Sequence, residues 1–464
     1  MSGDDRDNAE GDVAGTPVND DRYIVVSVDS HVGPSVTDQL GEYCPAAHRD
    51  AFERFVAEME AHGLMSWRSS EASKDGEDES WSLGRRLTPA DAEKFAKVAG
   101  IRNADQVDLA FMRRSVEASF CPGLQDHAAR LADMDHAGVA ASVIYHGGLN
   151  GQSIPFSTTG LITWGDTRYN ELEPVGVRMY NQWLADFVSQ APERHAGIAH
   201  IPISDPEACV REVEWAANAG LKGINLPAPR GDFPMLNDPV WEPLWAVCAE
   251  SGMSLNTHGG GGEHYPYKGD GAQSMYMMET AWRTRRGLWV MILGGVFERH
   301  PELKLVMTEQ WMDWATQVVA DMDGLYTGPA SGPLRATLPQ PPSVYFRRNC
   351  YLGASFLSNW EARYGVEHDL VANTMWGDDY PHAEGTWPHT REAMRATFHD
   401  IDPVHTRQYL GDTAIDVYGL DRRALAEIAG RIGPTVSEVA TPYTPPDDEA
   451  VGLYAFRTGP GIFA

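Results

Sequence analysis

Short apolar runs alternate with longer amphipathic segments along most of the chain. Residues 23–29 (YIVVSVD), 140–145 (AASVIY) and 303–308 (LKLVMT) are three of these runs. A short apolar run, rich in β-branched residues and followed by polar ones, is typical of a buried parallel strand. The remaining runs lie at residues 196–201, 220–226, 253–256, 344–346 together with 350–352, and 372–376.

Helical patterns separate most of the predicted strands. In residues 176–189 the side chains of Met179, Trp183, Leu184 and Phe187 fall on one face of a helix. The other helical patterns lie at residues 125–137, 206–219 and 240–251. Strand and helix alternate about eight times, which predicts an α/β fold of the (β/α)8 TIM-barrel type. An open, doubly wound sheet is the alternative that the same alternation allows.

Two segments are too long to be ordinary connections in such a barrel. Residues 32–124 follow the first predicted strand, and residues 259–300 follow the fifth. Long insertions after barrel strands typically form lids or interfaces. We therefore divide the chain into a disordered acidic tail (residues 1–21), a barrel that includes both insertions (residues 22–420), and a C-terminal extension (residues 421–464). We expect this extension to pack on the barrel or on a partner subunit.

Composition and charge narrow the classes of function. The 464 residues include 37 basic and 66 acidic side chains, a formal net charge of −29, which argues against binding to nucleic acid or to an anionic membrane. We expect a cytoplasmic protein, because no stretch resembles a membrane span and the acidic N-terminal segment lacks the features of a signal peptide. The five cysteines are widely spaced and form no C-x-x-C, so a disulfide framework or a cysteine zinc site is not expected.

Polar residues that could bind a metal follow nearly every predicted strand. In a barrel these positions meet at one end, where catalytic side chains sit. Imidazoles and carboxylates that converge there predict a metal site. The residues concerned are Asp29, His31, His146, His200, His258, Glu309, Asp378, Asp379 and His382.

Each of these residues taken alone is weak support for a metal site. With 16 histidines and 66 acidic residues, an acid two positions before a histidine is expected roughly twice by chance. Asp29 is equally consistent with a turn residue, His258 with a core histidine, and Glu309 with a solvated residue at a helix start. We place His146, His200, His382, Asp378 and Glu384 in a second tier, as additional ligands or as hydrogen-bond partners of ligands.

Four motif strings resemble those of a known family. They are VDSH (residues 28–31), NTHGGGG (256–262), GGVFERHPELKLVMTE (294–309) and WGDDYPHAEGTWP (376–388). Over residues 22–420 the chain resembles the amidohydrolase superfamily, in the branch of aminocarboxymuconate semialdehyde decarboxylase and benzoate-type decarboxylases. The resemblance implies a (β/α)8 barrel with metal at the carboxyl ends of the strands.

Position by position, the resemblance implies a ligand set of Asp29, His31, His258, Glu309 and Asp379. Of these, Asp379, His258 and Glu309 would also be the catalytic residues. Carboxylates replace imidazoles at Asp29 and Glu309, and such a set suits iron or manganese better than zinc. The lysine of binuclear hydrolases has no candidate after the fourth strand, which reads INLP.

The first functional hypothesis is a mono-oxygenase. The motif strings are also similar to those of a non-heme diiron mono-oxygenase of diterpenoid (platensimycin and platencin) biosynthesis. On this hypothesis two Fe ions activate O₂, an electron donor supplies electrons, and a bulky, apolar, terpenoid-like acid or thioester is hydroxylated. A wall for such a substrate would be formed by Trp311, Trp376, Tyr380, Trp387 and His264.

Two other classes of function remain open. One is a hydrolase or a non-oxidative decarboxylase with a single Zn or Mn ion, which is the usual chemistry of the superfamily. The other is a binding protein without catalysis on an enzyme fold. Relatives in this branch are often dimers, so the resemblance also implies a homodimer. A small-molecule substrate is expected on both enzyme hypotheses.

Overall fold

The computed structural model describes residues 22–61, 114, 117–147, 152–157, 167–227, 233–259, 271–355, 357–444 and 456–457. The predicted tail (residues 1–21), most of the first insertion and His264 lie outside the described residues. The domain division proposed from the sequence stays a prediction.

Eight parallel strands form a nearly closed barrel. In order around it they are β1 (Val26–Ser27), β3 (Ala141–His146), β4 (His195–His200), β5 (Gly223–Asn225), β6 (Ser254–His258), β7 (Leu305–Thr308), β8 (Cys350–Ser355) and β9 (Thr374–Gly377). A short strand β2 (His31–Val32) prolongs β1 and pairs with β3. At the seam, the Val28 amide donates to the Trp376 carbonyl and the Asp379 amide to the Asp29 carbonyl, each at 3.0 Å. The predicted TIM barrel is therefore confirmed and the open sheet is excluded.

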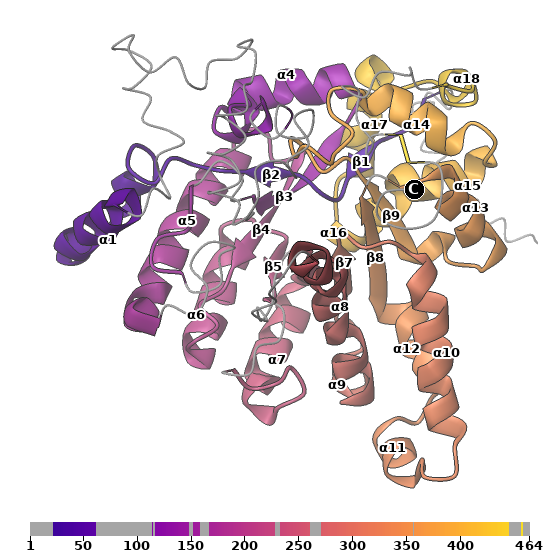
Figure 1. Cartoon of the computed structure of the whole chain (residues 1–464), viewed down its shortest axis with the longest axis horizontal. Helices are drawn as coiled ribbons and strands as arrows, with labels where there is room; N and C mark the ends of the chain where they lie inside the picture. The colour runs from indigo at the N-terminus through magenta and orange to yellow at the C-terminus, as the bar shows by residue number, and fades with distance from the viewer. Residues whose placement is uncertain are drawn as a thin grey trace, which may run out of the picture.

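Helices surround the strands, as Figure 1 shows. The α-helices are α1 (Arg49–Ala61), α4 (His127–Ala137), α5 (Glu173–Val188), α6 (Pro206–Asn218), α7 (Glu242–Ser251), α8 (Ala272–Leu293), α9 (Val296–Arg299), α10 (Asp313–Thr327), α11 (Gly332–Thr337), α12 (Pro342–Asn349), α13 (Asn359–Glu367), α14 (Thr390–Phe398), α15 (Pro403–Arg407), α16 (Thr413–Tyr418), α17 (Arg422–Ile432) and α18 (Val436–Val439). Shorter helical turns are η1 (Leu40–Tyr43), η2 (Ala46–His48), η5 (Pro122–Leu124), η6 (Thr167–Leu172), η7 (Pro239–Trp241), η8 (Val371–Asn373) and the π-helical η9 (Gln408–Asp412).

Residue-level signals explain where these helices begin and end. In α4 the Asp126 carboxylate accepts a hydrogen bond from the Ala129 amide, and Gly138 ends the helix with a φ of 79°. An acidic N-cap and a left-handed glycine after the last turn are the preferred helix boundaries. The four helical patterns predicted from the sequence correspond to α4, α5, α6 and α7.

One predicted strand segment is wrong. Residues 344–346 belong to α12 rather than to the seventh strand, which is β8 alone. The helix starts at Pro342, a residue that lacks an amide donor and has a fixed φ suited to the first helical position. Tyr345 and Phe346 of the short apolar run are buried on the inner face of this helix, whereas Val344 is exposed.

Two large clusters make up most of the apolar core of the described residues. Val28, Val143, Ile198, Val306 and Met375 belong to a cluster contributed by barrel strands. A larger cluster includes side chains of α5, α7, α8 and α10 and also contains Trp376, which is 1% exposed. Trp376 therefore packs in the core of the protein.

The contacts of the C-terminal part of the chain with the barrel include those of α17 and of Arg457. Leu425 and Ile428 of α17 belong to the cluster contributed by the strands. Further on, Arg457 forms an ion pair with Glu361 of α13 at 3.3 Å, and both side chains are buried.

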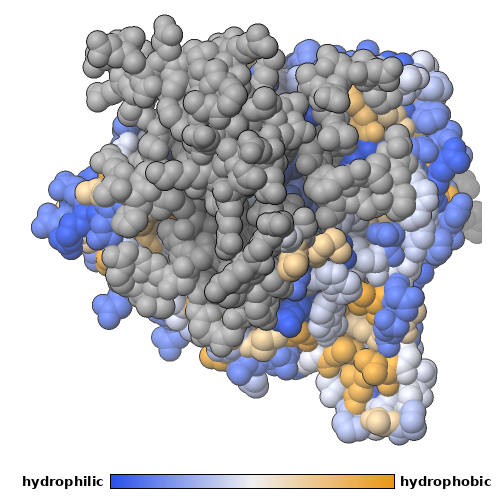
Figure 2. Space-filling view, in the orientation of Figure 1, coloured by the Kyte–Doolittle hydropathy of each residue, from blue (hydrophilic) through white to orange (hydrophobic). Residues whose placement is uncertain are grey.

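Among the described residues that Figure 2 colours, hydrophobic side chains gather over α10 to α12. Leu325 and Val344 are exposed residues of these helices. Within the described residues, no helix combines the length and the apolar character needed to cross a membrane.

Candidate functional site

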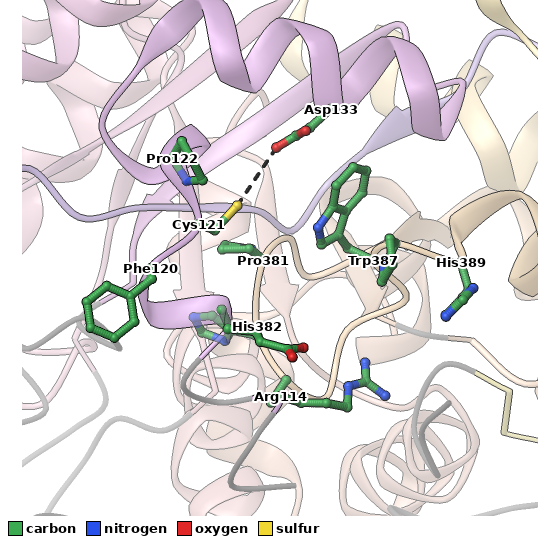
Figure 3. A pocket seen from close by; sticks show the side chains of 13 residues that line it. Arg114, Phe120, Cys121, Pro122, Asp133, Pro381, His382, Trp387 and His389 are labelled. Carbon is green, nitrogen blue, oxygen red and sulfur yellow. Dashed lines mark hydrogen bonds between the residues drawn. The ribbon is translucent and has the colours of Figure 1, made fainter. Parts of the chain in front are cut away.

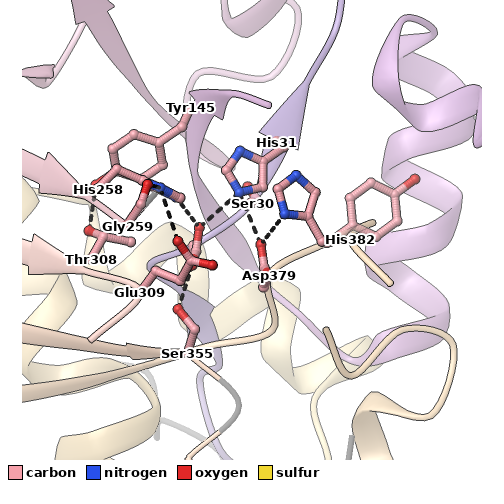
Figure 4. Close-up of polar contacts among 12 residues, drawn as sticks. Ser30, His31, Tyr145, His258, Gly259, Thr308, Glu309, Ser355, Asp379 and His382 are labelled. Carbon is pink, nitrogen blue, oxygen red and sulfur yellow. Dashed lines mark hydrogen bonds and ion pairs between the residues drawn. The ribbon is translucent and has the colours of Figure 1, made fainter. Parts of the chain in front are cut away.

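A cluster of imidazoles and carboxylates lies at the carboxyl ends of the strands. Asp29, at the end of β1, is within 3.1 Å of His258 Nε2 and 3.2 Å of His31 Nε2 through its Oδ1 atom. His31 comes from β2 and His258 from the last position of β6. Figure 4 shows the rings of His31 and His258, whose centroids are 4.9 Å apart. The strand-end positions predicted from the sequence are thus neighbours in space.

Asp379 joins this cluster from the turn after β9. Its Oδ1 atom is 3.0 Å from His31 Nε2, and its side chain is fully buried. The backbone of Asp379 has a φ of 53°, a left-handed conformation that is rare for residues other than glycine and costly outside functional sites. The neighbouring Asp378 instead accepts a hydrogen bond from the Ser27 hydroxyl at 2.6 Å. Of the two adjacent carboxylates, Asp379 is the one that faces the cluster.

Glu309, the residue after β7, also has a left-handed backbone, with a φ of 56°. Its Oε2 atom lies 3.4 Å from His258 Nδ1. The close approach depends on Gly259, because a Cβ atom at that position would lie 2.0 Å from Glu309 Oε2. The first glycine of the NTHGGGG string therefore leaves space for a carboxylate.

Two residues placed in the second tier belong to the cluster itself. The ring of His382 stacks on His31, and His382 Nδ1 is 3.2 Å from Asp379 Oδ1. The Glu384 carboxylate lies 3.9 Å from the same His382 nitrogen. Both residues lie in the loop after the last strand. Their position beside His31 and Asp379 therefore depends on the closure of the barrel, which the sequence pattern does not reveal.

The remaining second-tier histidines lie beside the cluster. His146 ends β3 and His200 ends β4, and their ring centroids are 6.0 Å apart. Burial lowers the pKa of His146 to about 3 and that of His200 to about 4, and the neighbouring His31 and His258 add to these shifts. Both imidazoles are therefore neutral at pH 7.

Burial and neighbouring charges shift the pKa values of the cluster. Burial raises the pKa of Glu309 to about 8, against the lowering influence of His258. Burial alone would lower the pKa of His258, but the Asp29 carboxylate beside it raises this pKa to about 10. Desolvation would raise the pKa of Asp29, yet the contacts with His258 and His31 hold it far below the ordinary value.

The donor atoms fit a divalent cation. Three groups of side chains each bring their ligand atoms within 4.8 Å of one another: Asp29 with His31 and His258, His31 with Asp379 and His382, and Glu309 with Asp379 and Glu384. Within the described residues, both oxygens of Asp379 and both nitrogens of His31 and of His382 are buried without a hydrogen bond. Buried polar atoms rarely lack a partner, and a bound cation would supply one.

Three further residues support the cluster and were not identified from the sequence. Ser355, the last residue of β8, donates a hydrogen bond to Asp29 Oδ2. Arg130 of α4 donates to the His31 carbonyl at 2.8 Å and to the Ser30 hydroxyl at 2.6 Å. Tyr145 places its ring 5.0 Å from that of His258. Ser355 could have been identified from its position at a strand end. No local sequence feature indicates the role of Arg130.

A cavity of about 380 Å³ lies next to the cluster, between the segment before α4 and the loop after β9. Figure 3 shows Phe120, Trp387, His389 and Arg114 around it. His382 belongs both to the cavity wall and to the cluster. Of the aromatic residues predicted to contact a substrate, Trp387 lines this cavity.

The other predicted substrate contacts have different surroundings. The Tyr380 hydroxyl donates to Asp133 at 2.5 Å; Asp133 lines the cavity, whereas Tyr380 does not. Trp311 lies near the guanidinium groups of Arg285 and Arg457.

Comparisons with known proteins point to one family. The family model described as amidohydrolase matches residues 161–420. The 2-amino-3-carboxymuconate-6-semialdehyde decarboxylase of Dictyostelium discoideum is 27% identical over 132 residues, which are 27% of this chain and 34% of that protein. The matched region thus spans about a third of this curated relative.

Solved structures share the fold. The 5-carboxyvanillate decarboxylase of Sphingomonas paucimobilis has a TM-score of 0.53 at 20% identity, with 86% of this chain and 100% of that chain covered. An amidohydrolase of Mycobacterium avium subsp. paratuberculosis reaches 0.57 at 18% identity, covering 86% and 99%. The 5-carboxyvanillate decarboxylase of Novosphingobium aromaticivorans, solved with bound manganese, reaches 0.56 at 15% identity, covering 86% and 97%.

These matches correct the first functional hypothesis. The mono-oxygenase expectation is wrong, because the matching family is amidohydrolase and the named relatives are decarboxylases. The mono-oxygenase hypothesis combined the similarity of the motif strings with the replacement of imidazoles by carboxylates, and such a replacement changes the preferred metal without requiring O₂ chemistry. A metal cofactor is supported; a pair of iron ions is not.

Proposed function

Because the chain belongs to the amidohydrolase family, we propose that it is a metal-dependent decarboxylase that acts without an oxidant. The buried cluster of Asp29, His31, His258 and Asp379 carries this proposal, since the ligand atoms of His31 and Asp379 lack hydrogen bonds and lie with Asp29 and His258 at the carboxyl ends of the strands. In a TIM barrel this end is where reactions take place. The decarboxylases among the similar proteins supply the reaction class.

The metal we propose is a single Mn²⁺ or Zn²⁺ ion. Asp29, His31, His258 and Asp379 would hold it, a set of two imidazoles and two carboxylates that suits borderline to hard divalent ions. The solved relative with bound manganese agrees with this choice. When bound, the ion withdraws electrons from the substrate and stabilises the negative charge that develops as the carboxylate leaves.

The side chains around the ion would control a proton. Loss of CO₂ breaks a carbon–carbon bond and leaves its electron pair on the substrate carbon, which then takes up one proton. We assign this proton to Glu309. Burial raises the pKa of Glu309 and so favours its protonated form, and Gly259 leaves room for this carboxyl group beside His258. A general acid needs a pKa near the working pH.

The test is release of CO₂ in the absence of O₂. The Mn²⁺-loaded protein is incubated anaerobically with carboxyl-labelled 2,6-dihydroxybenzoate and 5-carboxyvanillate, the acids named for structural neighbours. We expect labelled CO₂ from the native protein and from Asp378→Asn, whose side chain faces Ser27. Asp379→Asn is expected to lose both Mn²⁺ and activity.

Other results would contradict the proposal. Turnover that requires O₂ would remove the non-oxidative mechanism, and equal CO₂ release from metal-free protein would remove the metal. Glu309→Gln tests the proton donor separately: we expect Mn²⁺ content to stay unchanged while CO₂ release falls by about 10² or more. Full activity in Glu309→Gln would exclude Glu309 from that role.

A further inference from the structure

The cavity between the segment before α4 and the loop after β9 lies beside the metal cluster, and none of the four proposed metal ligands lines it. His382 stands between the two spaces. Its ring lines the cavity, and its Nδ1 atom lies 3.2 Å from Asp379 Oδ1. A ligand of this cavity would therefore sit next to the metal rather than on it.

Asp133 presents a carboxylate to the cavity from α4. The Tyr380 hydroxyl and the Cys121 thiol both donate to its Oδ2 atom, at 2.5 and 3.8 Å. No described residue donates a hydrogen bond to Oδ1 or forms an ion pair with this side chain. The carboxylate is therefore held in place through one oxygen, while the other oxygen and the negative charge are left for a ligand.

The basic side chains nearest to this carboxylate have other partners. Arg130, one turn earlier in α4, donates to the His31 carbonyl at 2.8 Å and acts on Asp133 only at longer range. Arg114 donates to the Gly385 carbonyl at 3.0 Å, and Figure 3 shows it well apart from the carboxylate, on the far side of the space. The chain as a whole has a formal net charge of −29, and a field of this sign attracts cations.

Aromatic rings flank the same space. Phe120 and Trp387 line the cavity, and Figure 3 shows their rings on opposite sides of it. The Trp387 ring is held in position by Tyr380 and His136, which meet it edge to face at 5.4 and 5.7 Å. The face of an aromatic ring attracts a cation, and proteins use aromatic walls to recognise organic ammonium ions.

The volume leaves room for more than a cationic group. An apolar cavity of about 150 Å³ is enough to bind benzene, and this one has about 380 Å³. Pro122 and Pro388 add apolar surface to its wall. The ligand that matches these walls combines an apolar body the size of one ring with a positively charged group.

We propose that this cavity is a binding site for an organic ammonium ion. The free oxygen of Asp133 accepts a charge-assisted hydrogen bond from the ammonium group, and the Phe120 and Trp387 rings cover its apolar body and attract its charge. None of these three residues is a proposed metal ligand, so the site does not depend on the proposed decarboxylation.

The test compares two molecules that share a benzyl group and differ in charge. Dissociation constants of benzylammonium and benzyl alcohol are measured by calorimetry at neutral pH with the Mn²⁺-loaded full chain. We expect benzylammonium to bind about tenfold more tightly, because only the cation gains the ion pair and the attraction to the rings. Asp133→Asn keeps an acceptor for the Tyr380 hydroxyl and removes the charge, so it should abolish this preference while benzyl alcohol binds as before.

Asp135→Asn is the matched control. Asp135 lies two residues further along α4, outside the cavity wall, and forms an ion pair with Arg194 at 2.7 Å. This variant removes the same charge from the same helix and should keep the preference for benzylammonium. Trp387→Leu leaves the hydrogen bonds of Asp133 in place and should weaken benzylammonium binding about threefold or more.

Four results would overturn the inference. Equal affinity for the two molecules in the native protein would remove the cation site. An unchanged preference in Asp133→Asn would show that the amine is held elsewhere, the metal included. Equal losses in Asp133→Asn and Asp135→Asn would mean that the net charge of the protein, rather than this carboxylate, attracts the cation. Native affinity in Trp387→Leu would exclude the aromatic wall.

Discussion

The imidazole of His382 stacks face to face on that of His31, with ring centroids 3.9 Å apart and planes inclined by 5°. His31 belongs to the beginning of the barrel, in β2, and His382 to the loop that follows its last strand. The contact therefore spans the seam where the barrel closes. The same seam brings Asp29 Oδ1 and Asp379 Oδ1 to the Nε2 atom of His31, at 3.2 and 3.0 Å, so the metal cluster is complete only where the barrel closes.

This contact predicts that His382 contributes to metal binding. His382→Ala removes the stacked ring and the nitrogen 3.2 Å from Asp379 Oδ1. We expect the affinity for Mn²⁺ to fall by about 10- to 100-fold, the usual effect of losing a residue that orients or supplements metal ligands. Mn²⁺ titration followed by electron paramagnetic resonance measures the change. His399→Ala, a histidine at the end of α14 outside the cluster, should bind Mn²⁺ like the native protein.

The strands could be predicted from the sequence because a buried parallel strand is a short, nearly continuous run of apolar residues. A run such as residues 303–308 is apolar on both faces, and it corresponds to β7 within a few residues. The same apolar runs predicted that Asp29, His258 and Glu309 follow strand ends, and the structure brings these three residues together. The run at residues 344–346 failed because three apolar residues are too few to distinguish a strand from the inner face of α12.

The remaining parts of the site depend on tertiary closure. His382 and Glu384 are no more conspicuous in the sequence than a chance H-x-E pair, and only the seam contact with His31 brings His382 to the cluster. Trp376 was expected in a substrate wall because it precedes the acidic pair, yet it is buried in the core. The choice between Asp378 and Asp379 follows from the left-handed backbone at Asp379, which strand periodicity cannot reveal.

Gly259 is predicted to be indispensable for the position of Glu309. A methyl group in Gly259→Ala would lie 2.0 Å from Glu309 Oε2, so the carboxylate must move away from His258. We expect CO₂ release to fall by about 10² or more, since a general acid acts only at hydrogen-bond distance, with little loss of thermal stability.

Gly324→Ala is the control for this substitution. Gly324 lies within α10 with open space around its Cα position, so alanine there should stabilise the helix by about 0.5–1 kcal/mol and leave activity unchanged. Thermal unfolding and CO₂ release are measured on both variants. Native activity in Gly259→Ala would show that Glu309 does not need its present position.

Removal of one partner of the ion pair between Arg457 and Glu361 is predicted to be strongly destabilising. Both side chains are buried, with Nη2 and Oε2 3.3 Å apart. Arg457→Ala leaves the Glu361 carboxylate buried without its cation, and removing one partner of a buried pair costs about 3–5 kcal/mol. Urea unfolding measures this loss. The double variant Arg457→Met, Glu361→Gln should recover most of it, because no uncompensated charge remains; a loss as large as in the single variant would mean that packing, rather than charge, dominates.

The lowered pKa values of His146 and His200 predict that the protein loses stability in mild acid. Burial lowers their pKa values to about 3 and about 4 in the folded protein, compared with about 6.5 in an unfolded chain. Between about pH 6.5 and pH 4 the unfolded chain binds protons that the folded protein excludes, so the free energy of unfolding decreases as the pH falls. Each histidine should contribute about 2 kcal/mol of this decrease between about pH 7.5 and pH 5.

Substitution isolates this contribution from that of other titrating groups. His200→Asn removes the titration and keeps a polar side chain, so its free energy of unfolding should depend less steeply on pH than that of the native protein. His399→Gln, a half-buried histidine of α14's C-terminal end, should leave the dependence unchanged. Urea unfolding at about pH 7.5 and about pH 5 gives both slopes. An equally steep decrease in His200→Asn would mean that His200 accepts its proton in the folded state, and hence that the space between His146, His200 and Tyr180 can accommodate a charge.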